Sequence, residues 1–131
     1  MNELAKEILD TVEIGALATV NVDRTPLVTP LHFARLGDSI VWISEPTARH
    51  SENAFRNGKA EFVVWDDKKR AVFLKTNVTE LPESEKEAAM AAYKEKLADF
   101  MPRCQNPQIY VAPIGELDEK TTTGNWLHFI A

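Results

Sequence analysis

The chain has 131 residues with a hydrophobic fraction of 44%, which suits a globular fold and excludes intrinsic disorder and collagen-like repeats, so we expect a single domain over residues 1–131. Its formal net charge of -5 argues against nucleic acid or an anionic membrane surface as a partner. Cys104 is the only cysteine, and the first residues form neither a basic leader nor a long apolar run, so we expect a cytoplasmic protein without an internal disulfide.

The spacing of apolar residues changes between a helical period and a period of two along the chain, which predicts the order of elements. We expect a helix over residues 2–12, strands over 15–22, 27–35 and 39–44, a helix over 47–56, strands over 60–65 and 71–81, a helix over 82–101, and strands over 108–117 and 125–130. Gly58 follows the second helix, where a left-handed residue commonly ends a helix.

Seven short strands with few helices predict a mainly β protein with flanking helices. Tight connections between the first strands favour an antiparallel barrel or sandwich, with the helices packed on its outside. A doubly wound parallel sheet would need regular crossover helices, and the pattern does not supply them.

The common catalytic signatures are missing from the sequence. It contains no glycine-rich dinucleotide fingerprint, phosphate-binding loop, paired-cysteine zinc motif or nucleophile elbow. His32, His50, His128 and Cys104 do not have the spacing of metal ligands. We therefore expect no metal site, and the catalytic residues stay unknown at this stage.

The segment from Ser44 to His50 joins a strand to a helix and has an unusual charge pattern. Arg49 and His50 stand in the first helical turn, where the partial positive charge of the macrodipole favours acidic residues. An anion bound by the free N–H groups would resolve this conflict, with Arg49 on phosphate oxygens and the Ser44 and Thr47 hydroxyls as donors. Alternatively, Ser44 or Thr47 caps the helix and Arg49 pairs with an acidic neighbour, either Glu45 or Glu52.

Several short motifs in this part of the chain resemble the flavin-binding split barrels related to pyridoxamine 5'-phosphate oxidase. The motifs are Ala16-Leu17-Ala18-Thr19-Val20, Asp23 and Pro26, Thr29-Pro30-Leu31-His32-Phe33, Ser44, Thr47-Ala48-Arg49-His50, Asn53, and Asn57-Gly58-Lys59-Ala60. The resemblance implies a six-to-seven-stranded antiparallel split β-barrel. It also implies a homodimer that holds FMN in two clefts between the subunits.

The resemblance also implies which residues contact the cofactor. The flavin ring would lie against Val28, Thr29, Pro30 and Leu31 and against Ile43 and Ser44, and the phosphate would lie near Thr47, Arg49 and His50. Trp126 of the second subunit would close the ring pocket, although its strand position favours packing in the dimer interface over direct flavin contact. The implied activity is an FMN-dependent oxidoreductase acting on a small molecule. The alternatives are a deazaflavin- or haem-binding barrel, or a flavin-binding protein without turnover.

Two departures from the family pattern change the expected properties. His50 stands where many relatives carry Lys, so we expect FMN affinity to fall as the pH rises through the usual histidine range. The chain also ends five residues after Trp126, without the Arg-rich segment by which pyridoxamine phosphate oxidases hold their substrate. We therefore do not expect that particular oxidase activity.

Overall fold

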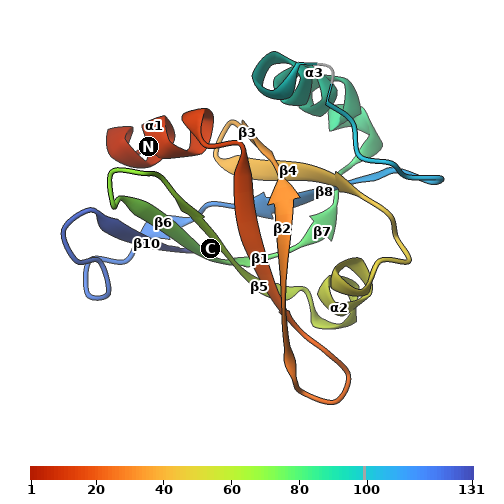
Figure 1. Ribbon diagram of the computed structural model, residues 1–131, viewed down its shortest axis with the longest axis horizontal. Helices are drawn as coiled ribbons and strands as arrows, with labels where there is room; N and C mark the ends of the chain where they lie inside the picture. The colour runs from red at the N-terminus through yellow and green to blue at the C-terminus, as the bar shows by residue number, and fades with distance from the viewer. Residues whose placement is uncertain (99) are drawn as a thin grey trace.

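The computed structural model describes residues 1–98 and 100–131, and its elements follow the expected order (Figure 1). The helical elements are α1 (Glu3–Thr11), α2 (Arg49–Asn57), a 3-10 turn η1 (Glu83–Glu85) and α3 (Lys86–Leu97). The strands are β1 (Ile14–Val20), β2 (Pro26–His32), β3 (Ala34–Leu36), β4 (Ser39–Ser44), β5 (Lys59–Trp65), β6 (Ala71–Asn77), β7 (Thr79–Glu80), β8 (Gln108–Pro113), β9 (Glu116–Leu117) and β10 (Trp126–Ile130).

Three of the expected strands bend and pass from one sheet to the other. The segment 27–35 divides at Phe33 into β2 and β3, the segment 71–81 divides at Val78 into β6 and β7, and the segment 108–117 divides at Ile114 and Gly115 into β8 and β9. Phe33, Val78 and Ile114 are all buried in the main core. The bends therefore occur where an apolar side chain points into the interior.

The strands form a six-stranded sheet in the order β2-β1-β5-β6-β10-β9 and a four-stranded sheet in the order β3-β4-β8-β7. Because the three bent segments belong to both sheets, the sheets close around one interior as a split barrel. Within the described residues every strand pair is antiparallel except the pair of β6 and β10, which is parallel. The mainly β split barrel with flanking helices is thus confirmed, with one parallel pair that the pattern did not indicate.

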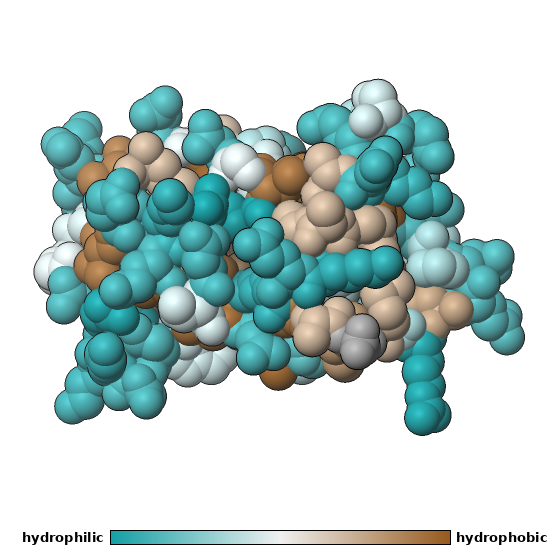
Figure 2. Space-filling view, turned by 90° about the horizontal axis from the view of Figure 1, so that it is seen from above, coloured by the Kyte–Doolittle hydropathy of each residue, from teal (hydrophilic) through white to brown (hydrophobic). Residues whose placement is uncertain are grey.

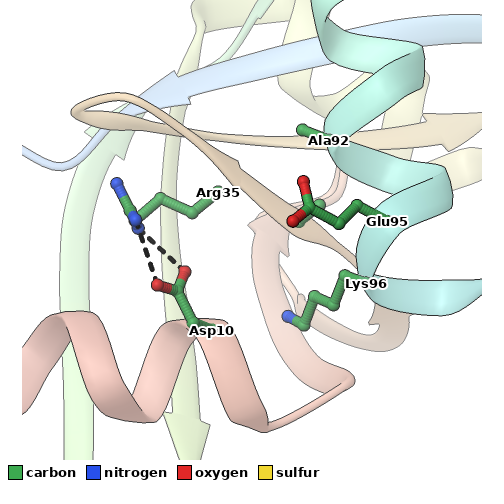
Figure 3. Close-up of a pocket in the computed structure, with 6 residues that line it drawn as sticks. Asp10, Arg35, Ala92, Glu95 and Lys96 are labelled. Carbon is green, nitrogen blue, oxygen red and sulfur yellow. Dashed lines mark hydrogen bonds and ion pairs between the residues drawn. The ribbon is translucent and has the colours of Figure 1, made fainter.

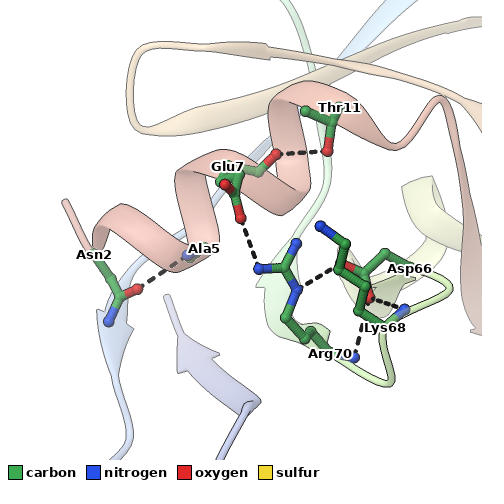
Figure 4. Close-up of polar contacts among 7 residues, drawn as sticks. All are labelled: Asn2, Ala5, Glu7, Thr11, Asp66, Lys68 and Arg70. Carbon is green, nitrogen blue, oxygen red and sulfur yellow. Dashed lines mark hydrogen bonds and ion pairs between the residues drawn. The ribbon is translucent and has the colours of Figure 1, made fainter.

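Helix α1 covers one end of the barrel, is capped at its N-terminus and is joined by an ion pair to a distant loop. Its N-cap residue Asn2 accepts a hydrogen bond from the Ala5 N–H at 3.0 Å. Arg70, in the loop between β5 and β6, donates to Glu7 of α1 at 2.7 Å and to Asp66 at 2.7 Å (Figure 4). This ion triplet joins the helix to a loop that is distant in sequence.

Helix α3 packs on the outer side of the four-stranded sheet and builds a second core. Tyr93 and Leu97 lie against Val41 and Ile43 of β4 and against Ile109 of β8. The helix ends at Leu97, earlier than the expected residue 101, because Ala98 has a positive φ of 55°. Figure 2 views α1 and α3 from outside and shows mostly hydrophilic side chains with apolar patches between them.

Among the described residues, no helix is long and apolar enough to cross a membrane. The longest of them, α3, has 12 residues, whereas a membrane-spanning helix needs about 20 apolar residues.

Two glycines with positive φ provide a test of the bend between β8 and β9. Gly115 has φ +79°, and a Cβ there would lie 2.2 Å from the Ile130 carbonyl oxygen, whereas Gly37 has φ +60° and open space around it. We expect Gly37→Ala to lower the free energy of unfolding by about 1 kcal/mol through backbone strain alone. Gly115→Ala should cost about 3 kcal/mol because it also displaces β10. Equal losses in urea unfolding would contradict this close approach.

Candidate functional site

The start of α2 lacks the side-chain cap that would satisfy its first N–H groups. The N-cap residue is Ala48, and neither Ser44 nor Thr47 caps the helix. Within the part of the chain that the structure describes, Arg49 forms no ion pair with Glu45 or Glu52. The alternative in which Ser44 or Thr47 caps the helix and Arg49 pairs with Glu45 or Glu52 is therefore wrong. The exposed Arg49 side chain remains available for an anion beside the helix start.

His50 contacts Ser44 instead of pointing into solvent. The Ser44 Oγ and His50 Nε2 atoms are 2.6 Å apart, and only 9% of His50 is exposed. Burial lowers the pKa of His50 below its ordinary value of 6.5, so the imidazole is neutral at neutral pH. We expected His50 to gain and lose its proton in the usual pH range of histidine, and this expectation is wrong because burial lowers its pKa. The positive charge of this segment at neutral pH comes from Arg49.

Arg49 lines a cavity of about 450 Å³ between α2 and the turn that joins β1 to β2. Asn53 ties the helix to this hairpin, because its side-chain amide donates to Thr19 Oγ1 at 3.1 Å and to Asn21 Oδ1 at 2.9 Å. Arg56 adds a hydrogen bond to the Val20 carbonyl at 2.9 Å. Asp23 and Glu52 line the same cavity, but among the described residues Arg49 forms no ion pair with either of them.

A second cavity, of about 280 Å³, brings together four of the expected cofactor residues: Pro30, Leu31, Ile43 and Ser44. We call it the ring-end cavity. Tyr93 of α3 and the segment 100–104 complete its wall, and Phe100 stacks on His32 with ring centroids 3.8 Å apart. Sequence reasoning missed Tyr93 as a site residue, because its helical spacing with Leu97 indicated only packing.

The two cavities lie toward opposite ends of β2. The Arg49 cavity includes Thr25 just before the strand, and the ring-end cavity includes Leu31 near its end. Six residues of extended chain span about 20 Å. Val28 and Thr29 lie between them, Val28 on the exposed outer face and Thr29 paired with Leu17. A long molecule with an anionic end could therefore lie along β2 and reach both cavities.

Trp126 lies apart from these cavities in the single chain. It is on β10, which three strands separate from β2 in the six-stranded sheet. Its indole is 53% exposed and donates to the Lys69 carbonyl at 3.2 Å. The expected alternation of β10 is confirmed, since Leu127 and Phe129 are buried on the other face. Contact of Trp126 with a cofactor stays a prediction that requires a second chain.

Another cavity, of about 330 Å³, separates α1 from α3 (Figure 3). Arg35 binds the Asp10 carboxylate through Nε at 2.9 Å and Nη2 at 3.0 Å. Lys96 donates to the Leu9 carbonyl at 2.8 Å and lies 3.6 Å above the Phe33 ring. Burial lowers the pKa of Lys96 to about 8. These groups are mutually engaged and hold α1 and α3 on the barrel.

Across residues 1–98 and 100–131 no cluster of metal-ligating side chains was found.

Comparisons with known proteins agree with the fold described above. The fold is that of solved split barrels, including a heme binding protein from Mycobacterium smegmatis (TM-score 0.72, 21% identity, 86% of this chain and 50% of that chain). A second is an F420 reductase, with a TM-score of 0.67, 19% identity and coverage of 82% of this chain and 90% of that chain. A third is a FAD-binding protein from Mesorhizobium loti, with a TM-score of 0.68, 20% identity and coverage of 88% of this chain and 91% of that chain. The present chain thus spans half the length of the mycobacterial protein.

The sequence itself identifies the family. The model of the pyridoxamine 5'-phosphate oxidase family matches residues 1–116, and the chain belongs to that family. No functionally curated protein matches the chain. The resemblance drawn from the short motifs around β1, β2 and α2 is confirmed at the level of family and fold.

The buried His50 predicts a pH-dependent stability. Because its pKa is lowered in the folded state, the unfolded chain binds the proton more readily, so the contribution to stability is full above pH 6.5 and is lost as the pH falls through the lowered pKa. Urea unfolding of the wild type and of His50→Gln should show a difference in free energy that shrinks on acidification. A difference that stays constant over this range would show that His50 does not titrate as inferred.

Proposed function

We propose that this protein binds FMN along β2 and acts as an oxidoreductase on a small molecule. The phosphate would lie at the start of α2 beside Arg49, and the ring would lie toward Leu31, Ile43 and Ser44. The observation that carries the proposal is the uncapped start of α2 with its free Arg49, in line along β2 with the ring-end cavity.

The residues present fit the two chemically different ends of FMN. A phosphate carries about two negative charges and needs several donors. Arg49 and the first N–H groups of α2 supply these donors, and the exposed Thr47 can add its hydroxyl. The ring is flat and mostly apolar, and Leu31 and Ile43 offer it aliphatic surface. His50 holds Ser44 at 2.6 Å and so fixes the hydroxyl at the end of β4.

Bound FMN would supply the electron-transfer chemistry, which explains why no catalytic dyad is required from the protein. The task left to this chain is to bind, orient and partly enclose the cofactor. Asn53 and Arg56 keep α2 in position against the β1–β2 turn, so the phosphate donors stay fixed relative to β2. Phe100 and His32 cover the other end.

The structural relatives support a flavin-type cofactor, since they include proteins named as FAD-binding and as an F420 reductase. Others are named as heme-binding, so haem is the main competing ligand. The absorption spectrum of protein purified from cells separates the cases, because flavin, deazaflavin and haem absorb at different wavelengths. A haem spectrum would replace the FMN proposal.

We also propose that two copies associate through the outer face of the six-stranded sheet. This face carries Trp65, Phe73, Trp126 and Ile130 on neighbouring strands. Trp65, Trp126 and Ile130 are 55%, 53% and 46% exposed, and Phe73 and Trp126 have ring centroids 5.8 Å apart. Exposed aromatic clusters of this kind mark interaction surfaces. A second copy would cover them and could bring its own Trp126 to the cofactor cleft.

The phosphate site predicts that Arg49→Ala weakens FMN binding by about 1.5 to 3 kcal/mol, the range for hydrogen bonds to charged groups. This corresponds to a dissociation constant roughly 10- to 100-fold higher in a flavin fluorescence titration. Riboflavin lacks the phosphate and should bind both proteins alike. Arg24→Ala is a matched control, because it removes the same charge from the adjacent turn and Arg24 does not line the cavity. Equal losses for FMN and riboflavin would refute the phosphate contact.

The dimer predicts a specific effect of charge on the outer face. Trp126→Glu would bury a carboxylate against Phe73 and its partner, which costs several kcal/mol. We expect size-exclusion chromatography with light scattering to give a dimer for the wild type and a monomer with less bound flavin for Trp126→Glu. Val22→Glu, at an 81% exposed position in the β1–β2 turn, should remain dimeric; because Val22 lines the Arg49 cavity, this variant is a control for the oligomeric state and not for flavin binding. A monomeric wild type, or a dimeric Trp126→Glu, would exclude this interface.

A further inference from the structure

The wall of the ring-end cavity includes a residue whose polar group has no partner among the described residues. Tyr93 is only 1% exposed and lines this cavity from α3. Its hydroxyl has no hydrogen-bond partner among the described residues. A buried hydroxyl without a partner is costly, and such groups in folded proteins point to a missing ligand or water. The position of Tyr93, beside four of the residues expected to face the cofactor, favours a ligand.

The surroundings of the Tyr93 hydroxyl are neutral and largely apolar. Burial and the neighbouring Cys104 raise the pKa of Tyr93 to about 12, so the hydroxyl keeps its proton and can donate it. Burial and Glu45 raise the pKa of Cys104, so the thiol also stays uncharged. The Glu45 carboxylate accepts from the Asn106 N–H at 3.2 Å, and Arg103 is exposed. Among the described residues that line the cavity, Glu45 and Arg103 carry opposite charges, and neither is hydrogen-bonded to the Tyr93 hydroxyl.

The size of the cavity limits what it can hold. Its volume is about 280 Å³, slightly below the range that starts at about 300 Å³ for typical ligand pockets. Leu31, Ile43 and Phe100 supply apolar surface to its lining. A single ring with one polar substituent matches this combination of volume, apolar walls and one donor.

We propose that the ring-end cavity binds the small-molecule substrate, a neutral one-ring compound with a carbonyl oxygen, and that Tyr93 donates its hydrogen bond to this oxygen. The role as a substrate site rests on the proposed function, in which the flavin ring would lie across the mouth of the cavity against Leu31, Ile43 and Ser44 and would leave the space beside Tyr93 to the substrate. Tyr93 is then a positioning residue that selects for the acceptor oxygen.

Two probes of similar shape test the hydrogen bond. Acetophenone carries a ketone oxygen, and ethylbenzene has a methylene in its place. We expect wild-type protein, as purified, to bind acetophenone more tightly than ethylbenzene by about 3- to 10-fold in calorimetric titrations, which is the effect of one neutral hydrogen bond. Tyr93→Phe should remove this preference. Tyr110→Phe is the control, since Tyr110 is equally buried and does not line the cavity.

Stability without any probe gives a second measurement. If the Tyr93 hydroxyl has no partner, Tyr93→Phe should have an unchanged or higher melting temperature. A lower melting temperature would show that the hydroxyl is already bonded within the protein and would overturn the proposal. Binding of both probes with equal affinity, or loss of the acetophenone preference in Tyr110→Phe as well, would also overturn it.

The same titration on FMN-saturated protein separates this proposal from the flavin site. Retained acetophenone binding supports a substrate cavity beside the cofactor. Acetophenone displaced by FMN would mean that the flavin ring itself occupies the cavity, which overturns the substrate assignment and leaves the proposed function intact. If FMN does not bind at all, the proposed function fails, whereas the Tyr93-dependent preference measured without FMN still tests the hydrogen bond.

Discussion

Four aromatic side chains in contact fill the interior of the barrel, and the elements around the candidate site are arranged on them. Phe62 meets Phe33 edge-to-face at 5.1 Å and stacks with Trp42 at 6.0 Å, and Trp42 stacks with Tyr110 at 6.2 Å. Phe33 is the residue at which the chain passes from β2 to β3, and Trp42 comes two residues before the end of β4. The packing of these rings therefore fixes where β2 bends and where β4 ends. It also explains Gly15, because a Cβ there would lie 2.3 Å from the Phe62 ring.

Around the candidate site, one set of polar groups bonds within the protein and another is left to bind a ligand. His50 and Ser44 satisfy each other, and Asn53 and Arg56 join α2 to the β1–β2 hairpin. A neutral His50 contributes no charge at neutral pH, so electrostatic attraction of an anion depends on Arg49 and the helix start. This division keeps the backbone donors of α2 fixed, which lowers the entropy lost when they bind a ligand, whereas the exposed Arg49 side chain would lose rotamer freedom on binding.

The two sheets differ in how their outer faces are covered. Helix α3 packs on the four-stranded sheet and buries Tyr93 and Leu97 against it, and Lys96 and Arg35 hold α3 and α1 in place through contacts with the end of α1. The six-stranded sheet instead exposes Trp126 and its aromatic neighbours. The proposed association of two copies would cover these exposed aromatic side chains. The placement of Tyr93 follows from the same asymmetry, because α3 carries it to the edge of the covered sheet, next to the end of β4.

Local patterns in the sequence were sufficient for the order of the elements, the mainly β class and the family, because period-two alternation, turn residues and short motifs act between neighbouring residues. They also indicated the conflict at Arg49, which the structure places beside an uncapped helix start. The bends at Phe33, Val78 and Ile114 and the parallel pairing of β10 could not be found in this way, because they depend on which distant strand lies alongside. The neutral state of His50 and the unpartnered hydroxyl of Tyr93 were equally inaccessible. Both depend on burial by segments far away in the chain, and burial controls the pKa and the hydrogen-bonding needs of a side chain.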